Sequence, residues 1–379
     1  MIKRYPTLGV LNKRQAEALQ AKLLYSVENI SACSLEPETQ EIVIGLTSDT
    51  DLAVVNETVN KLIDKEKTNR IIGHRTVWTT EEQDQNDGEH GRGDHRIESV
   101  FSVDGTVRSG LAVVLAQRLD ALLVDLALRH RAELRSYSSK ISLDTLNKCG
   151  YIASFPQNLY LVAEFPHALQ TLEQVRHAER LDELVRLSPF TLSPAVCFHC
   201  YAELSGLRLK GPLALTASGL CHRHEAPWRL GNHRLNEFTM REIVLFGDSA
   251  HIEAQRSAIM EEVWNLFQSL GLSGKIENAS DPFYFSEDSA KGQHQIMGNM
   301  KYELIADLGE PRGSFSIASF NHMGDSLCKP FQVHDTDDAP LNSGCVAFGI
   351  DRWVYALLSS YGPSSTEWPA EVRKALHLD

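Results

Sequence analysis

The chain has 379 residues, of which 42% are hydrophobic and 23% charged, an ordinary composition for one large globular domain or two domains. It contains no apolar run of about 18 residues and no signal-peptide core, and its seven scattered cysteines favour a reducing cytoplasm over a disulfide framework, so we expect no membrane partner. The formal net charge of −13 argues against a long polyanion such as tRNA.

The first 80 residues predict a small α/β domain without a catalytic constellation. Residues 41–46 read as a short apolar strand, and residues 52–65 carry apolar side chains at helical spacing. Ser48 or Asp49 is the expected cap of that helix. We can assign no role to this domain from its residues.

Residues 81–98 predict a linker between two domains. The segment is acidic and polar with almost no apolar residue, so it cannot bury enough surface to order itself. The domain organisation expected is therefore a small domain over residues 1–80, this linker, and a larger domain over residues 99–379.

The larger domain opens with an amphipathic helix over residues 110–130, which would lie on a sheet or at a dimer contact. Residues 133–137 and 141–157 read as strand-like. A charged helix is expected over residues 167–187, whose polar face is either simply solvated or a docking surface for an acidic partner. The basic side chains of that face are Arg176, Arg180 and Arg186.

A hairpin in the middle of the chain has the residues needed to hold a nucleotide. One apolar strand ends at Cys221, and a second resumes from Arg234. Arg223 offers a fork of donors to a phosphate, Glu225 accepts from an exocyclic amine, and Phe238 offers a flat face to a purine. The alternative is a surface hairpin whose charges are incidental.

A second element near the C-terminus favours the nucleotide interpretation. A strand of small residues reaches Gly349 and runs into a helix that opens with Asp351 and Arg352. The start of a helix offers unpaired N–H groups and a positive dipole end to a phosphate. An earlier strand could direct Lys301 and Glu303 toward the same site.

Three metal-binding residue types fall on segments expected to be neighbouring strands, namely Cys197, Glu242 and Cys345. Two thiolates and one carboxylate suit zinc, and three protein ligands leave a fourth position open. The competing interpretation pairs Cys197 with Cys200 as half of a structural zinc knuckle or as a redox pair. No second Cys-x-x-Cys completes the knuckle, and alternation along a strand would separate the two thiols.

The Arg-x-Glu hairpin and the later Gly-x-Asp-Arg resemble motifs 2 and 3 of the class II aminoacyl-tRNA synthetases. The resemblance covers roughly residue 101 to the end, and it implies an α+β fold with an antiparallel sheet flanked by helices. Motif 1 is weak, because residues 133–140 lack the usual proline of its dimer strand.

Several short patterns resemble the amino acid–[carrier protein] ligases, which are relatives of the zinc-dependent seryl-tRNA synthetases of methanogens. They are Pro194-Ala-Val-Cys197, Arg223-His-Glu225, Phe238-Thr-Met-Arg-Glu242, Ser319-Phe-Asn321 and Ser343-Gly-Cys-Val-Ala-Phe-Gly349. The resemblance implies ATP-dependent activation of a small amino acid to an aminoacyl-adenylate, followed by transfer to the phosphopantetheine thiol of a carrier protein. Glycine or alanine is favoured.

The resemblance also implies site residues and cofactors. Zinc would be held by Cys197, Glu242 and Cys345, and ATP with Mg²⁺ would bind nearby, with Arg223 and Arg352 catalytic and Phe238 stacking on adenine. The remaining ATP contacts would be Glu225, Arg234, Leu235, Lys301, Ser316, Ile317, Ala318 and Ser319. Ser316 stands where the family has a magnesium-binding Glu. A homodimer and a carrier protein, rather than tRNA, are the expected partners.

Two further alternatives follow from the same motifs. A seryl-type tRNA synthetase should carry a long coiled-coil arm or a basic domain, and residues 1–80 show neither. A catalytically inactive class II relative should have lost site residues, whereas Arg223, Glu225 and Arg352 are all present.

Overall fold

The computed structural model describes residues 1–378 except residues 24–25, 28, 49, 70–72, 81–96, 103–104, 232, 282–291, 293–294 and 311, and it describes only the backbone of residue 228. The predicted linker therefore lies almost wholly outside the described residues, as does Asp49, one of the two expected caps. Within the described residues, no helix is both long and apolar enough to cross a membrane.

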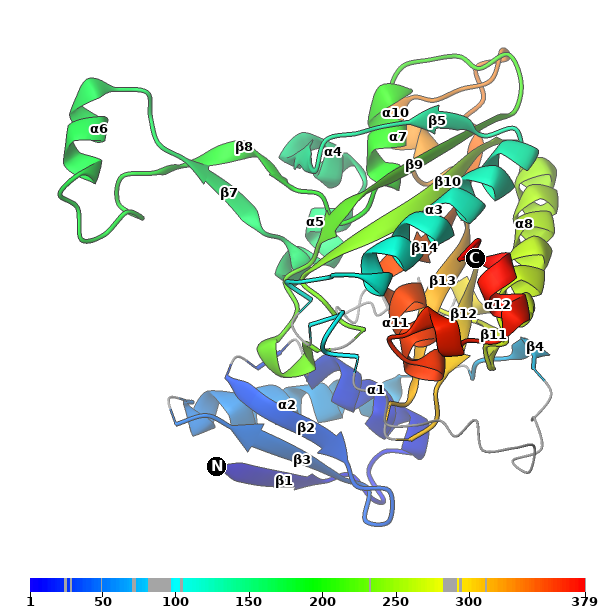
Figure 1. Ribbon diagram of the computed structural model, residues 1–379. Helices are drawn as coiled ribbons and strands as arrows, with labels where there is room; N and C mark the ends of the chain where they lie inside the picture. The colour runs from blue at the N-terminus through cyan, green and yellow to red at the C-terminus, as the bar shows by residue number, and fades with distance from the viewer. Residues whose placement is uncertain are drawn as a thin grey trace.

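An eight-stranded sheet forms the body of the molecule (Figure 1), with the strand order β4-β11-β12-β13-β14-β10-β9-β5. The strands are β4 Thr76–Thr79, β5 Glu133–Arg135, β9 Leu213–His222, β10 Glu237–Gly247, β11 Gly274–Asn278, β12 Lys301–Asp307, β13 Ser314–Gly324 and β14 Asn342–Gly349. Neighbouring strands are antiparallel except β5, which runs parallel to β9. The predicted α+β fold with a large, mostly antiparallel sheet is confirmed.

Helices cover both faces of this sheet because its strands alternate apolar side chains on both sides. On one face lie α3 (Leu111–Arg129), α8 (Ser249–Ser269) and α11 (Ile350–Tyr361), which share a core with Ile243 and Leu245 of β10. On the other face lie α7 (Cys197–Glu203) and α10 (Cys328–Phe331), which share a core with Val244 and Phe246.

The long amphipathic helix is α3, one residue shorter at each end than predicted. Leu115, Leu119 and Leu123 are buried against the sheet, as their spacing requires. Val114 and Leu128, at 39% and 47% exposure, face away from the core. The helix therefore presents a second, uncovered apolar edge.

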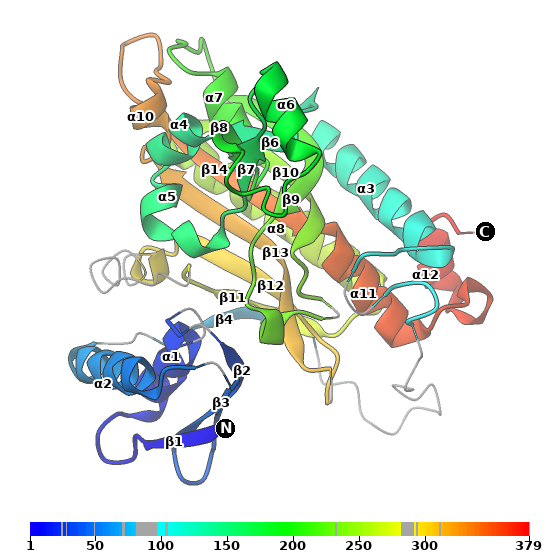
Figure 2. The same cartoon turned by 90° about the vertical axis from the view of Figure 1, so that its left-hand side faces the viewer.

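The N-terminal residues form a three-stranded sheet with two helices, which lies below the large sheet in Figure 2. Its elements are β1 Ile2–Pro6, α1 Lys13–Leu23, β2 Ile30–Leu35, β3 Glu41–Leu46 and α2 Leu52–Thr68. The cap of α2 is Asp51, whose Oδ1 accepts from Ala53 N at 2.8 Å, and not Ser48. Since β4 joins the large sheet beside β11, the first 80 residues also contribute a strand to the body; the division near residue 80 stays a prediction.

An insertion between α3 and β9 projects from the body (Figure 1). It contains β6 Lys140–Ser142, α4 Leu143–Lys148, α5 Tyr151–Ser154, β7 Leu161–Glu164, α6 Leu169–Val175 and β8 Arg186–Leu192. The strand-like interpretation of residues 141–157 is wrong, because Ser142 Oγ accepts from Thr145 N at 3.0 Å and starts a helix there.

The charged helix expected over residues 167–187 is also wrong in extent, because only α6 is helical. At the end of a projecting arm a helix has no body to pack against, and packing supplies most helical stability. Two of the three arginines considered as a docking surface for an acidic partner already have acidic neighbours. Arg180 pairs with Asp182 at 2.6 Å, and Arg186 lies 4.0 Å from Glu164.

Candidate active site

The predicted hairpin is β9 and β10, joined by a loop with a single 3-10 turn, η2 (Pro227–Arg229). The second strand begins at Glu237, three residues later than the predicted Arg234. Alternation places Phe238 and Met240 on the face of Val196 and Cys221, as predicted. Arg241 points to the opposite face, where its Nε donates to Asp120 of α3 at 2.5 Å.

Arg223 follows β9 directly and lies half-buried beside the aromatic residue proposed to stack on adenine. Its guanidinium lies 5.2 Å from the centre of the Phe238 ring. Its Nε donates to the carbonyl of Pro194 at 3.1 Å. Among the described residues, the other guanidinium nitrogens make only a weak contact with the sulfur of Met240, at 4.0 Å, so most of these donors bind no oxygen atom of that part of the chain.

Glu225 is 8% exposed and has one oxygen to spare. Its Oε1 accepts from Arg234 Nη1 at 2.9 Å. Its Oε2 is buried and accepts no hydrogen bond from the described residues, although Arg229 Nη1 lies 3.8 Å away. A buried carboxylate oxygen without a donor is costly, so this position suits a ligand that brings an N–H group.

Arg352 lies in the first turn of α11, where it was predicted, and its fork is anchored to two backbone carbonyls. Its Nε donates to His233 O at 3.0 Å and its Nη1 to Ser316 O at 2.7 Å. Burial, followed by the charges of Arg234 and Arg223, lowers the pKa of Arg352 to about 10. The three guanidinium groups thus repel one another, and a bound anion would relieve the repulsion.

The strand proposed to lie under ATP is the start of β13. Ile317 and Ala318 are buried in the core, while Ser316 and Ser319 are half-buried. Ser316 Oγ lies 3.3 Å from the carbonyl of Ala318. Of these four residues, Ile317 and Ala318 could meet a ligand mainly through their backbone.

Lys301 of β12 is engaged by acidic neighbours. Its Nζ lies 2.5 Å from Asp281 Oδ1 and 3.1 Å from Glu303 Oε1. Burial works against its charge, but these two carboxylates raise the pKa of Lys301 above its usual value. Lys301 and Glu303 lie on the same face of β12, and Asp281 is a partner that the sequence did not reveal. That this face points toward the nucleotide stays a prediction.

Cys197, Glu242 and Cys345 meet in one place. One possible ligand atom from each lies within 4.8 Å of the other two. Cys345 Sγ lies 3.1 Å from Glu242 Oε2. β10 and β14 are neighbours as predicted, but Cys197 is not on a strand: it is the first residue of α7.

The backbone at the start of α7 holds the carboxylate in place. Val196 N donates to Glu242 Oε1 at 2.8 Å, and Cys197 N donates to Glu242 Oε2 at 3.0 Å. Glu242 is 1% exposed and Cys345 6%. A hydrogen bond with Cys197, together with burial, raises the pKa of the Cys345 thiol well above its usual value, so only a cation that displaces its proton would make it a thiolate.

One short segment, residues 193–197, joins the arginine cluster to these three residues. The carbonyl of Pro194 accepts from Arg223, and two and three residues later the N–H groups of Val196 and Cys197 hold Glu242. The arrangement can bind a polyphosphate on one side and a soft metal ion on the other.

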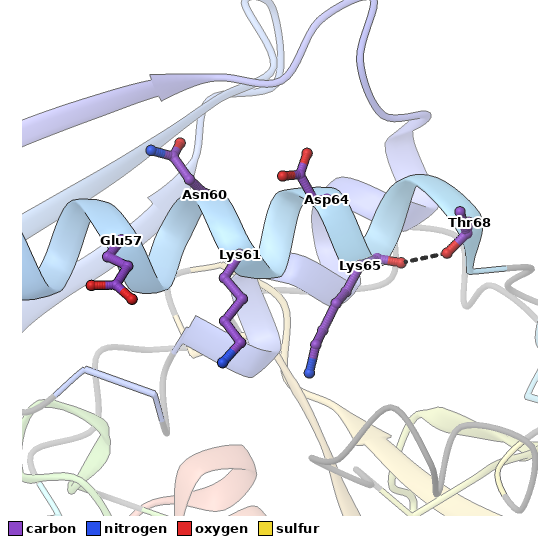
Figure 3. Close-up of a pocket in the computed structure, with 6 residues that line it drawn as sticks. All are labelled: Glu57, Asn60, Lys61, Asp64, Lys65 and Thr68. Carbon is purple, nitrogen blue, oxygen red and sulfur yellow. Dashed lines mark hydrogen bonds between the residues drawn. The ribbon is translucent and has the colours of Figure 1, made fainter.

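A depression lies on the exposed face of α2 (Figure 3) and is lined by Glu57, Asn60, Lys61, Asp64, Lys65 and Thr68. Its only drawn hydrogen bond joins Thr68 Oγ1 to the Lys65 carbonyl, at 3.1 Å. It contains none of the residues predicted to bind ATP or metal and resembles a solvated helix face.

The amino acid–[acyl-carrier-protein] ligase 1 of Bradyrhizobium diazoefficiens is 30% identical to the chain over 298 residues, which cover 75% of this chain and 90% of the relative. The chain belongs to the amino acid–[acyl-carrier-protein] ligase family. It is therefore a ligase. Ligase 2 of the same bacterium is 27% identical over 303 residues, or 75% and 87% of the two chains. No family model matches the chain.

More distant relatives and solved structures agree on the fold of this ligase. A type-2 serine–tRNA ligase of Methanococcus maripaludis is 26% identical over 251 residues, covering 62% of this chain and 49% of the relative. The seryl-tRNA synthetase of M. kandleri, solved with A. aeolicus tRNASec, superposes with a TM-score of 0.69 at 20% identity, over 93% and 75% of the two chains. The class II synthetase fold is thus confirmed.

The contacts of two residues near the candidate site, Asp351 and His233, were not predicted from the sequence. Asp351 is 2% exposed; its Oδ2 accepts from Thr239 N at 2.6 Å and its Oδ1 lies 2.6 Å from Arg108 Nε. It therefore ties α11 to β10 and to the segment before α3. His233 lies in the loop of the hairpin and its ring stacks on that of Phe315, with centroids 4.1 Å apart. Phe315 is too far along the chain for any local pattern to indicate this contact.

His233 makes the stability of the ligase depend on pH. Burial, followed by the charges of Arg352 and Arg234, lowers the pKa of His233 to about 4. A lowered pKa means that the stability contributed by the neutral ring is complete above the ordinary pKa of about 6.5 and is lost as the pH falls toward 4.

The His233→Phe variant should remove this dependence while keeping a flat ring. Between about pH 7 and about pH 4, the wild-type ligase should lose about 3 kcal/mol more of its free energy of unfolding than the variant. Urea unfolding at several pH values measures both. His177→Phe, at an exposed histidine of the insertion, should follow the wild type, and parallel curves for all three proteins would contradict the expectation.

Proposed function

We propose that the chain uses ATP to activate a small amino acid and passes the aminoacyl group to the phosphopantetheine thiol of a carrier protein. The observation that carries this is the meeting of Cys197, Glu242 and Cys345 beside the arginine cluster. First, an amino acid carboxylate oxygen bonds to the α-phosphorus of ATP and pyrophosphate leaves. Then the thiolate sulfur bonds to the acyl carbon and AMP leaves.

The described side chains support specific roles toward ATP. The uncommitted donors of Arg223 and the charge of Arg352 would neutralise the phosphates, and Glu225 Oε2 would accept from the adenine amine. Phe238 would stack on the base. Arg234, Leu235, Lys301 and the backbone of residues 316–319 would line the remainder of the nucleotide. No protein nucleophile is needed, so catalysis rests on positioning and charge neutralisation.

Zinc fits the three residues that meet at the start of α7. Two buried thiols and one carboxylate that is already oriented by two N–H groups form a donor set typical of zinc. Cys197, Glu242 and Cys345 would hold the ion, and a bound zinc ion would supply Lewis-acid chemistry for the neutral α-amine of the substrate. Mg²⁺ would accompany ATP and offset the charge of its polyphosphate.

Glycine and alanine are the amino acids we favour. The side-chain amide of Asn321, the β13 residue opposite Cys345, already donates to Ser319 Oγ at 3.1 Å and to Cys345 O at 3.0 Å. Its N–H groups are thus committed and do not offer a donor to a substrate hydroxyl, which a serine-specific site should provide.

All seven cysteines are free thiols, which supports the cytoplasm as the compartment.

A carrier protein is preferred to tRNA as acceptor for two reasons. The ligases align along almost their whole length, whereas the chain spans about half the length of the serine–tRNA ligases it matches. The net charge of −13 also opposes an extended contact with a polyanion.

The first prediction from the proposed function concerns the two half-reactions. The purified chain should exchange labelled pyrophosphate into ATP only when glycine or alanine is present, and it should then form a thioester with a phosphopantetheinylated carrier protein. The Arg352→Ala variant should lose about 100- to 1,000-fold of the exchange rate. Charging of tRNA without charging of the carrier protein would replace this proposal by the tRNA synthetase alternative. No exchange with any of the standard amino acids would favour an inactive relative.

The second prediction concerns the metal. Replacing Cys345 or Cys197 by Ser should lower the affinity for zinc by at least about 100-fold, because each loses a direct ligand. Cys200→Ser is the matched control: it lies in the same helix as Cys197 and is 1% exposed. Metal analysis of the purified proteins decides. A loss of zinc in Cys200→Ser with retention in Cys345→Ser would support a structural Cys-x-x-Cys clip instead.

We also propose a homodimer built on β5 and α3. β5 is the last strand of the sheet, and no other strand of the described part of the chain pairs with its outer edge. Leu134 on this strand is 54% exposed, and Val113, Val114 and Leu128 of α3 are 39% to 47% exposed. An open edge together with exposed apolar side chains is typical of a surface that a second copy covers.

The Leu134→Lys variant should therefore raise the dissociation constant of the dimer by roughly tenfold or more, because it places a charge at an apolar contact. Leu181→Lys is the matched control, since Leu181 is 50% exposed on the projecting insertion. Light scattering over a range of protein concentrations measures the mass. Equal masses for both variants at every concentration would rule out this interface.

A further inference from the structure

Three segments that contribute residues to the proposed ATP site are joined by one aromatic cluster. His233 belongs to the loop of the β9–β10 hairpin, Phe315 to β13 and Tyr355 to α11. The rings of His233 and Phe315 are stacked, with centroids 4.1 Å apart and planes 7° from parallel. Tyr355 lies against both, at 5.8 Å and 5.6 Å.

Two backbone carbonyls at this stack accept hydrogen bonds from the guanidinium of Arg352. The carbonyl of His233 accepts from Arg352 Nε at 3.0 Å, and the carbonyl of Ser316, next to Phe315, accepts from Nη1 at 2.7 Å. The two carbonyls that hold Arg352 thus belong to His233 and to the residue next to Phe315, the two residues whose rings are stacked. Tyr355 lies one turn after Arg352 on the same helix, so the cluster also contacts the helix that carries Arg352.

From this geometry we propose that His233 is a positioning residue for the ATP step: its ring, stacked on Phe315, holds the fork of Arg352 in the orientation that meets the nucleotide. The inference rests on the proposed function, since it assumes that Arg352 contacts ATP. His233 itself need not touch the substrate.

The surroundings require a ring that is flat and uncharged. Arg352 and Arg234 both disfavour a proton on the imidazole, and its Nδ1 is buried without a hydrogen-bond partner among the described residues. The packing therefore uses the faces of the ring, and none of the hydrogen bonds between described residues includes an imidazole nitrogen of His233. A phenyl ring has the same flat shape and no charge, whereas a methyl group removes the stacked partner of Phe315 and leaves it only the tilted contact with Tyr355.

The experiment compares His233→Ala with His233→Phe in amino-acid-dependent pyrophosphate exchange. In His233→Ala, KM for ATP should rise roughly tenfold, since an aromatic pair contributes about the free energy of one factor of ten. KM for the amino acid should not change, because Cys197, Glu242 and Cys345 are held by other contacts. His233→Phe should restore KM for ATP to within about twofold of the wild type.

Other outcomes would overturn the inference. An unchanged KM for ATP in His233→Ala, or a fall in kcat alone as expected from partial misfolding, would show that the stack does not position Arg352. A similar rise in both variants would mean that the imidazole contacts ATP itself. Calorimetric titration of the same variants with ATP reads the effect without turnover. If wild type shows no exchange, the proposed function fails, and the titration still decides the role of His233.

Discussion

The site depends on a buried carboxylate of β10 that two other segments, the start of α7 and β14, hold in place. Glu242 is 1% exposed, and none of the ion pairs among the described residues includes it. Two N–H groups of α7 and one thiol of β14 satisfy its oxygens. Burying a carboxylate without a cation costs several kcal/mol, so the fold maintains this group at a cost that a bound metal ion would offset.

The register of β10 decides what this carboxylate can meet. Arg241 and Glu242 are consecutive, and alternation sends them to opposite faces of the sheet. Arg241 forms its ion pair with Asp120 under α3, while Glu242 faces α7. A slip of one residue would exchange the two charges and leave both unpaired. The ladder with β9 and β14, each pairing along most of the strand, prevents that slip.

Elements whose apolar residues recur at a regular spacing could be predicted from the sequence. The period of two in β10 and the apolar stripe of α3 reflect burial on one face, and burial follows residue type. The helix α7 could not be predicted from the sequence, because it is short and lacks a side-chain cap. It also contains Phe198 and Tyr201, which favour strands. It is helical because Tyr201 packs on Phe246 of β10, with ring centroids 5.4 Å apart.

Two further features of the site could not be predicted from the sequence: contacts between distant segments, and a local charge that differs from the net charge of the chain. The stack of His233 on Phe315 leaves no local trace in either segment. The net charge of −13 likewise conceals a site where Arg223, Arg234 and Arg352 converge closely enough to lower the pKa of Arg352. Charges act over roughly 10 Å in physiological salt, so a compact triphosphate at the proposed site would respond mainly to the three arginines, while a long nucleic acid would also meet the net negative charge of the rest of the chain. A partner that brings one phosphodiester and a thiol on a narrow arm is therefore compatible with both charge patterns.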